Sequence, residues 1–161
     1  MGRDDWSKHH PDDPAFFRNL LDQGFRVRIM GCEAKGWGLG NHPNLDLLDV
    51  NQEAPEDFLN TLHAFHYWAH PDWFEAFCRV TLEAQSCGVP VVAEGRHGFL
   101  DYLRQEEGSC LFENSDEALD FLTRLRGSAE FWEVQSALAI TVADEVLDPV
   151  RLEESLDFYM R

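Results

Sequence analysis

The stretch from Ala69 to Ala93 restricts the possible folds of this chain most strongly. Pro71 ends a short apolar run, and apolar residues then recur every three to four positions, which predicts a helix. Gly88 ends this helix, and the continuously apolar run 89–93 follows. A strand, a helix and a second buried strand in this order form the repeating unit of a parallel sheet. The stretch therefore predicts an α/β fold.

Two glutamates lie on the predicted helix, Glu75 at its start and Glu83 eight residues later. Eight helical residues span about 12 Å of rise and roughly 80° of rotation. This separation suits an extended ligand with hydroxyl groups at both ends and a phosphate between them, bound at the helix N-terminus. The alternative is structural: Asp72 caps the helix, Glu75 supports its first turn, and Glu83 is solvated.

The residues around these glutamates resemble a known signature. Seven residues separate Glu75 from Glu83, and Ala84, Gly88 and Pro90 follow before a pair of valines. This pattern is similar to the donor-binding signature of retaining glycosyltransferases of family 4, and the similarity extends over roughly residues 2–126. It implies an α/β domain with a Rossmann-like parallel sheet flanked by helices, the C-terminal half of the two-domain GT-B fold.

The resemblance also implies roles for individual residues. Glu75 is expected to contact the sugar hydroxyls and Glu83 the ribose diol. Arg3 and Lys8 match a Gly-Arg-x4-Lys segment that grips the diphosphate. As catalytic residues we therefore expect Arg3, Lys8 and Glu75, because two cations neutralise the charge that develops on a leaving diphosphate. The alternative for both cations is an ordinary exposed surface charge. Further donor-binding positions implied by the resemblance are Ala76, Phe77, Arg79, Val80, His97 and Gly98.

The chain departs from the family pattern at several positions. Ala76 and Cys78 stand where the family usually has glycines, and a Cβ there narrows the approach of a ligand to the backbone. His97 and Gly98 replace a pair of glycines, and Asp101 takes the place of a glutamate. Cys78 is not expected to be a nucleophile, because the sequence places no base beside it.

Length, charge and cysteine content limit the other classes of function. A chain of 161 residues is expected to be a single domain, 1–161, with its own core. A net charge of −17 argues against nucleic acid and an anionic bilayer as partners. No apolar run is long enough to span a membrane, and no signal peptide is apparent. Four scattered cysteines without a C-x-x-C pair suit a reduced, cytoplasmic protein.

The remaining periodicities predict the other elements of the domain. We expect a mobile loop over 35–44, where three glycines and a proline occur. Further strands are expected at 25–30, 45–50 and 108–112, and the first strand of the central unit at 67–69. Helices are expected at 15–22, 55–65, 116–125, 129–146 and 149–159.

Three histidines, His63, His66 and His70, raise the question of a metal site, since three imidazoles would suit zinc. The predicted strand at 67–69 separates His66 from His70, however, and no acidic fourth ligand is apparent. We therefore expect no metal and no cofactor. The resemblance likewise implies a metal-independent enzyme whose nucleotide-diphosphate sugar is a substrate.

The resemblance thus implies that this chain supplies the donor-binding half of a retaining glycosyltransferase. The acceptor is held by an N-terminal half in such enzymes, and the chain begins where the first strand of the C-terminal half is expected to have ended. We expect a longer enzyme, or another segment, to complete the sheet, and the isolated chain to bind donor without transferring it. Two alternatives stay open: a non-catalytic binding or assembly module, and a nucleotide-sugar epimerase, which shares the architecture.

Overall fold

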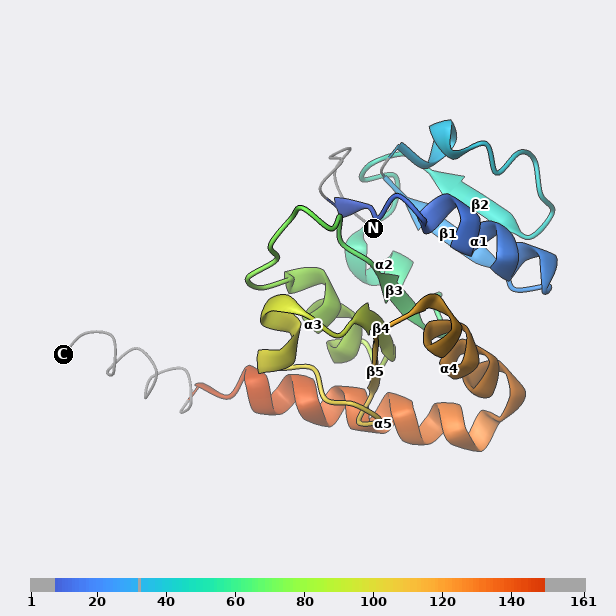
Figure 1. Cartoon of the computed structure of the whole chain (residues 1–161). Coiled ribbons are helices and arrows are strands. Elements are labelled where there is room, and N and C mark those ends of the chain that lie inside the picture. Colours follow the sequence, from blue (N-terminus) through green and yellow to red (C-terminus); the bar gives the residue numbers. More distant parts are fainter. Residues whose placement is uncertain (1–7, 32, 150–161) are drawn as a thin grey trace.

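Five parallel strands form the centre of the structure, a computed structural model that describes residues 8–31 and 33–149 (Figure 1). Helices lie on both sides of the strands. The α-helices of the described part are α1 (Asp13–Asp22), α2 (Pro55–Leu59), α3 (Arg79–Ser86), α4 (Ser115–Gly127) and α5 (Ala129–Val146). The strands are β1 (Val27–Met30), β2 (Leu45–Leu48), β3 (Phe65–Tyr67), β4 (Val91–Glu94) and β5 (Ser109–Phe112), and the 3₁₀ helices are η2 (Glu33–Trp37) and η3 (His97–Asp101).

The described strands are divided between two sheets. β1 pairs with β2 in one sheet, with Val27 opposite Leu45. The other sheet has the order β3-β4-β5, with Phe65 opposite Val91 and Val91 opposite Ser109. All pairings are parallel, so each consecutive pair needs a crossover connection. The unit β3–α3–β4 is the strand–helix–strand unit that the sequence predicts.

The central strand β4 shows how the layers are built. Its residues Val91 and Ala93 belong to a core cluster with residues of α2, α3 and α5. Val92, whose side chain points to the opposite face, belongs to a second cluster with α1 and α4. All three side chains are fully buried. A strand buried on both faces requires continuously apolar residues, which explains the unbroken apolar run in this part of the sequence.

Local capping explains where the C-terminal helices begin. The Asn114 side chain accepts hydrogen bonds from the amides of Asp116 and Glu117, at 3.1 and 3.2 Å, and thereby starts α4. The hydroxyl of Ser128 accepts one from the Phe131 amide at 3.1 Å and starts α5. These two helices confirm the predictions for 116–125 and 129–146 within a few residues.

Several predicted boundaries are wrong. The helix expected at 55–65 ends at Leu59, because Phe65 joins β3 and its amide bonds to the Pro90 carbonyl at 2.9 Å. The strand expected at 67–69 lies at 65–67 for the same reason. The segment 35–44, expected to be a loop throughout, includes the end of η2. The helix expected at 149–159 lies almost wholly outside the described residues.

The predicted fold class, a Rossmann-like parallel sheet flanked by helices, is confirmed by this arrangement. The helices α1, α4 and α5 have the predicted positions, and β1, β2, β4 and β5 lie within or next to the predicted strands. None of the described helices combines the length and the apolar character needed to cross a membrane.

Candidate functional site

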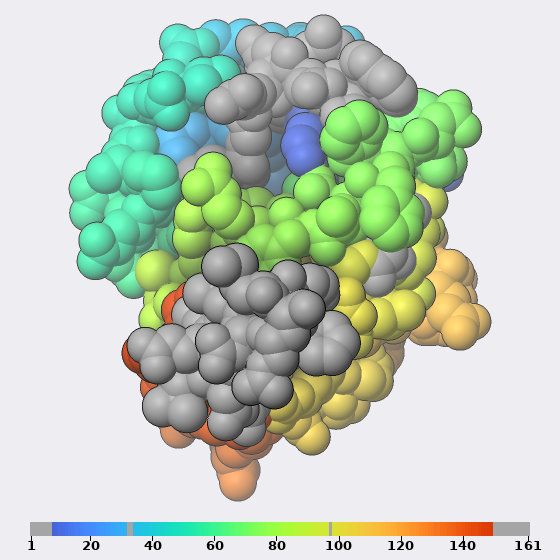
Figure 2. Space-filling view, turned by 90° about the vertical axis from the view of Figure 1, so that its left-hand side faces the viewer, coloured from blue at the N-terminus to red at the C-terminus, as the bar shows by residue number. Residues whose placement is uncertain are grey.

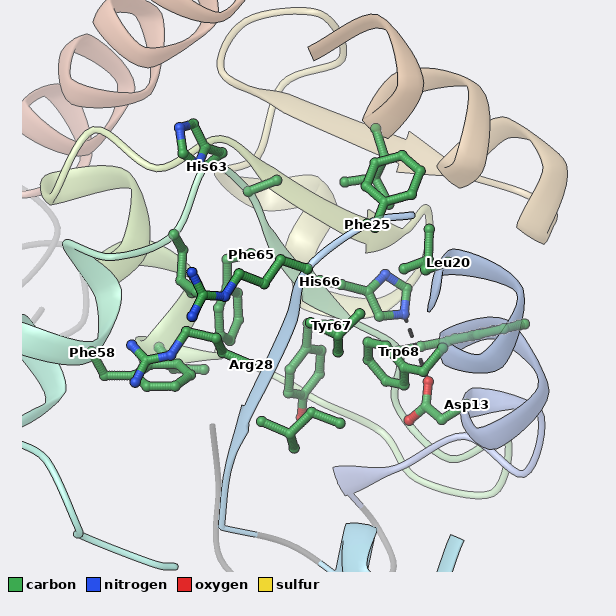
Figure 3. A pocket seen from close by; sticks show the side chains of 18 of the residues that line it. Asp13, Leu20, Phe25, Arg28, Phe58, His63, Phe65, His66, Tyr67 and Trp68 are labelled. Atoms are coloured by element: carbon green, nitrogen blue, oxygen red, sulfur yellow. Dashed lines mark ion pairs between the residues drawn. The ribbon is translucent and has the colours of Figure 1, made fainter. Parts of the chain in front are cut away.

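A cleft of about 960 Å³ lies between β1 of one sheet and β3 of the other (Figure 3). Side chains from both strands line it, and those of α1, α4 and the α2 region add apolar surface. The segment that leads into α3 forms a polar part of its wall. In Figure 2 this segment, coloured green, lies on the molecular surface beside the teal segment around α2. The predicted site residues that line the cleft are Lys8, Glu75, Phe77, Arg79, Val80 and Glu83.

Glu75 is the most buried of these polar residues, with 9% of its surface exposed. Its carboxylate forms a short ion pair with the ammonium group of Lys8 and accepts a 3.0 Å hydrogen bond from the Tyr67 hydroxyl. The ammonium group also lies 5.6 Å from the ring centroid of Trp73. The structure therefore brings together two predicted catalytic residues that are 67 positions apart.

Tyr67 is held in its protonated form. Burial, together with the neighbouring Cys78 and Glu75 side chains, raises the pKa of its phenol. A protonated phenol donates to the carboxylate, so Glu75 accepts from Tyr67 and Lys8 at the same time. This arrangement fixes the orientation of the carboxylate at the cleft wall.

The helix expected to carry both glutamates is shorter than predicted. α3 begins at Arg79, so Glu75 lies in an irregular segment and Asp72 does not cap the helix. In a helix that began earlier, the carbonyl of Glu75 would accept a hydrogen bond from the amide of residue 79. Here it accepts one from the Gly98 amide instead, at 3.0 Å. The prediction that a helical rise of about 12 Å separates Glu75 from Glu83 is therefore wrong. Both residues nevertheless line the same cleft.

The start of α3 is fixed by the hydroxyl of Tyr102. This hydroxyl accepts from the Cys78 amide at 3.3 Å, lies 3.1 Å from the Cys78 carbonyl oxygen, and is 2.8 Å from the Thr81 hydroxyl. Burial raises the pKa of Tyr102 to about 12 and also raises the pKa of the Cys78 thiol. Both groups therefore stay neutral, and Cys78 acts as a buried apolar residue.

The N-terminal end of α3 is open towards a ligand. The described residues provide no hydrogen-bond acceptor for the amides of Arg79 and Val80, which stand in the first turn of the helix. Such amides carry a partial positive charge and can bind a phosphate. Glu83 is exposed one turn further along and also faces the cleft.

Ala76 and Gly98 lie next to each other beside this segment, outside the lining of the cleft. A Cβ added to Gly98 would stand 1.7 Å from the Ala76 carbonyl oxygen, so only glycine fits there. This contact lets η3 hold the segment that carries Glu75. The side chain of His97 and all of Arg3 lie outside the described residues, so their predicted roles stay predictions.

Arg96 binds the backbone on the other side of the same segment. Its guanidinium donates to the carbonyls of Ala69 and His70, at 2.9 and 3.2 Å, and pairs with the carboxylate of Glu94. A bidentate cation that bonds to several carbonyls fixes a loop more firmly than a single contact does. Arg96 therefore fixes the chain just before Glu75, as Gly98 does just after it.

A buried acid–base pair, Asp13 and His66, also lines the cleft. The Nε2 atom of His66, on β3, lies 3.6 Å from Oδ1 of Asp13, at the start of α1, as the dashed line in Figure 3 shows. Burial opposes ionisation of Asp13, but the neighbouring imidazoles of His66 and His9 hold its pKa below the ordinary value. Among the described residues, no group of three or more His, Cys, Asp or Glu side chains is placed to hold a metal ion.

Sequence reasoning missed the residues that hold the site in place. Tyr67, Thr81 and Tyr102 form the hydrogen bonds around Glu75 and Cys78, and Arg96 fixes the preceding loop. A single sequence gives little signal for such partners, because they are brought together from different elements. The one available hint is that Tyr67 and Tyr102 lie in apolar stretches of the sequence, because a tyrosine buried there needs a hydrogen-bond partner for its hydroxyl.

Comparisons with known proteins concern the family and the fold of this chain. The family model described as "Glycosyl transferases group 1" matches residues 22–122. A comparison with curated protein sequences gave no match. Among solved structures, HepE from Anabaena, in complex with UDP, is similar with a TM-score of 0.80 and 16% identity, over 99% of this chain and 47% of HepE. This chain therefore spans about half the length of HepE.

Two other solved structures show the same fold. TarM is similar with a TM-score of 0.80 and 19% identity, over 97% of this chain and 33% of TarM. The C-terminal domain of LpcC, a group 1 family glycosyl transferase from Francisella tularensis, has a TM-score of 0.67 and 14% identity, over 90% of this chain and 82% of that domain. At these identities the likeness concerns the fold.

Proposed function

Because this chain belongs to the group 1 glycosyl transferases, we propose that it binds the nucleotide-diphosphate sugar donor of a retaining, metal-independent glycosyl transfer. The acceptor would be held by a further, N-terminal half of the enzyme. Residues 1–161 would then form one donor-binding domain. HepE was solved with UDP and glucose, which makes UDP the first nucleotide to test here.

The observation that carries this proposal is the composition of the polar wall of the cleft. Lys8, Arg79, the two carboxylates and the amides at the start of α3, which have no acceptor among the described residues, lie along it. A diphosphate needs a cation and the amides, while sugar and ribose hydroxyls need carboxylates as acceptors. The local positive groups can attract the diphosphate although the whole chain has a net charge of −17.

In the proposed complex, Lys8 exchanges its partner. Without donor its ammonium group pairs with Glu75. A diphosphate at the start of α3 would compete for this cation, and Arg3 would add a second one. Charge develops on the diphosphate as the bond to the sugar breaks, so these cations would stabilise the leaving group more strongly in the transition state.

Release from Lys8 would leave the Glu75 carboxylate free to accept hydrogen bonds from the sugar. The hydrogen bond from Tyr67 would keep the carboxylate in the same orientation during this exchange. Glu83 would bind the ribose diol further along α3. Ala76, Phe77, Arg79, Val80, His97 and Gly98 would form the surroundings of the donor, with Phe77 half-exposed at its rim.

The test is calorimetric titration of the whole chain with UDP, GDP and ADP, each beside its nucleoside. We expect one diphosphate to bind at least tenfold more tightly than its nucleoside, because the cations and amides contact only the phosphates. Equal affinity for a diphosphate and its nucleoside would contradict the proposed phosphate site. Failure of all three diphosphates would favour the non-catalytic binding module instead.

Two variants separate the roles of the carboxylate and the cation. Glu83→Gln should weaken binding of the preferred nucleoside and its diphosphate by the same factor, roughly tenfold for a lost charged hydrogen bond. Lys8→Met should leave nucleoside binding unchanged and remove most of the diphosphate increment. Glu133→Gln, which removes an exposed carboxylate from α5, is the matched control and should change neither. A Glu83→Gln variant with unchanged affinity would overturn the ribose role.

A further inference from the structure

Three aromatic side chains are exposed in the loop that carries Glu75, on the molecular surface (Figure 2). Trp73, Phe74 and Phe77 have 39, 67 and 49% of their surface exposed. Among the described residues, they are the only aromatic members of the exposed large apolar side chains. Glu75 lies between them in the sequence, yet it is buried at the cleft wall. Apolar side chains that gather on a surface in this way mark an interaction site.

The loop is held in place from several sides. The Arg96 guanidinium donates to backbone carbonyls just before the aromatic residues. The Gly98 amide bonds to the Glu75 carbonyl, and the ring centroid of Phe77 lies 5.0 Å from that of Tyr102. A ligand that binds to a fixed loop costs less conformational entropy than one that must order it. The aromatic surface is therefore preorganised for binding.

This surface is continuous with the candidate donor site. The ammonium group of Lys8 lies over the ring of Trp73, 5.6 Å from its centroid, and also pairs with Glu75. Phe77 lines the cleft itself. A molecule on these rings would therefore lie next to the carboxylate that we propose binds the donor sugar. That is the position which a glycosyl acceptor needs.

Charge limits the chemistry of such a molecule. Residues 70–78 include the carboxylates of Asp72 and Glu75 and no lysine or arginine. The Asp72 side chain, next to Trp73, is 86% exposed. An anionic group would find no cation on this loop. A neutral pyranose fits, because its C–H face can stack on an aromatic ring while its hydroxyl groups donate to a carboxylate.

We propose that Trp73 and Asp72 form an acceptor subsite for a neutral pyranose, and that Lys8 covers this subsite until the donor binds. Without donor, the ammonium group lies over the indole ring. When a diphosphate takes Lys8, that part of the ring is uncovered. The donor would then bind first and the acceptor second. The role as acceptor rests on the proposed function, whereas the binding of a pyranose to Trp73 does not.

The test measures binding of methyl β-glucopyranoside and methyl β-galactopyranoside to the whole chain by saturation-transfer difference NMR. Sorbitol, which has the hydroxyl groups but no ring face, is the matched control ligand. We expect at least one pyranoside to bind with millimolar affinity, and sorbitol not to bind at the same concentrations. Saturating UDP should tighten pyranoside binding about two- to fivefold, the factor that an exposed cation–π contact contributes.

Variants of Trp73 test the stacking contact. Trp73→Ala should weaken pyranoside binding at least fivefold, whereas Trp73→Phe keeps an aromatic face and should stay within threefold of the wild type. Val134→Ala, at an apolar residue of α5 that is 50% exposed, is the control and should change nothing. Trp73→Ala should not weaken UDP binding, because the indole competes with the diphosphate for Lys8.

The variant Lys8→Ala tests the cover without any nucleotide. Alanine is used because a methionine could itself pack on the indole ring. We expect the variant without UDP to bind the pyranoside as tightly as the wild type does with UDP. UDP should then have no further effect on pyranoside binding by the variant. A pyranoside affinity that neither UDP nor Lys8→Ala changes would overturn the covering role of Lys8.

Three results would overturn the subsite itself. These are no saturable binding of either pyranoside, equal binding of sorbitol, or unchanged pyranoside affinity in Trp73→Ala. Tighter binding of 1-hexanol than of the pyranosides would also overturn it and would assign the surface to alkyl chains. The two proposals fail separately. Pyranoside binding that depends on Trp73, without UDP binding, would contradict only the donor role, and UDP binding without pyranoside binding would contradict only the subsite.

Discussion

The two sheets of this domain differ in how completely they are buried. In the three-stranded sheet, Val91, Val92 and Ala93 of β4 have no exposed surface, and helices cover both faces. In the two-stranded sheet, every residue of β2 is partly exposed. We infer that more of the packing energy lies in the larger unit, although Val27, Ile29 and Met30 of β1 are also buried. The smaller unit supplies one side of the cleft. Substitutions that match in chemistry but differ in unit can test this division.

The largest difference is expected between two glycines that both have positive φ. A Cβ on Gly108, at the start of β5, would stand 2.4 Å from the backbone of Ala139 in α5. A Cβ on Gly24, before β1, meets nothing within 4 Å. Gly108→Ala should therefore cost about 3 kcal/mol or more, from overpacking and backbone strain together. Gly24→Ala should cost only the strain, about 1 kcal/mol.

Urea unfolding of the two glycine variants measures this contrast, with the slope of the transition as a check on two-state behaviour. The Gly108 amide also donates to Oε1 of Gln135 at 2.9 Å, so displacement of α5 should disturb that bond. Equal unfolding free energies for the two variants would show that β5 and α5 are not packed as tightly as the structure indicates.

The second contrast compares leucines in the two units. Leu103 is 3% exposed and belongs to the core cluster beneath α3 and α5, whereas Leu47 on β2 is partly exposed. Leu103→Ala should cost about 2–4 kcal/mol, because it removes buried surface and leaves a cavity. Leu47→Ala should cost about 1 kcal/mol, because less apolar surface is lost. Thermal unfolding of both variants at the same pH and salt measures the two losses of stability. A larger loss for Leu47→Ala than for Leu103→Ala would show that the smaller unit is the more tightly packed one.

The larger unit contains both the most accurate and the least accurate predictions from the sequence. The run Val89 to Ala93 is continuously apolar because β4 is buried on both faces, and Gly88 has the positive φ of a helix end. The prediction of a helix that begins at Glu75 failed, because tertiary contacts outweigh the local pattern there. The Gly98 amide donates a hydrogen bond to the carbonyl of Glu75, and the Tyr102 hydroxyl accepts one from the amide of Cys78. Neither contact leaves a periodic trace in a sequence.

The candidate site shows the same limit. The resemblance predicted that Glu75, Glu83 and Lys8 bind one donor, and the structure shows that all three line one cleft. The pairing of Lys8 with Glu75, and the role of Tyr67 in orienting the carboxylate, depend on segments that meet only in the folded chain. Residue type and the resemblance therefore predicted which residues line one cleft, while the geometry of their partners required the structure.

A third substitution addresses the joint between the two units. Asp13 on α1 faces His66 on β3. The Oδ2 atom of Asp13 accepts a hydrogen bond of 3.1 Å from the backbone amide of His10. Asp13→Asn should cost about 1–2 kcal/mol at neutral pH, because it removes the charge that faces His66 and His9 and weakens the hydrogen bond from the His10 amide. The pKa of Asp13 is lowered in the folded state, so its ionised form stabilises the fold above the ordinary value of 3.8.

The contribution of the ionised Asp13 is therefore expected to disappear as the pH falls below 3.8 and through the folded pKa. Urea unfolding between pH 7 and pH 3 should show the wild type and Asp13→Asn converging at the acid end. Asp12→Asn, at an exposed neighbouring carboxylate, is the control and should not converge in this way. A difference between wild type and Asp13→Asn that is independent of pH would show that the ionised form has no special role.

The smallest contrast compares two arginines that form ion pairs in different settings. Arg28 on β1 bonds to Asp46 at 2.9 Å and to Glu53 at 2.7 Å, with 16% of its side chain exposed. Arg104 pairs with Glu145 on the surface, with 43% exposed. Arg28→Ala should cost about 1 kcal/mol, because two charged hydrogen bonds hold β1, β2 and the loop before α2 together. Arg104→Ala should cost a few tenths of a kcal/mol, and molar salt should remove even that. We therefore expect polar contacts to contribute more to the stability of the smaller unit, and packing to contribute more to that of the larger one. An Arg28→Ala variant as stable as Arg104→Ala would contradict this distinction.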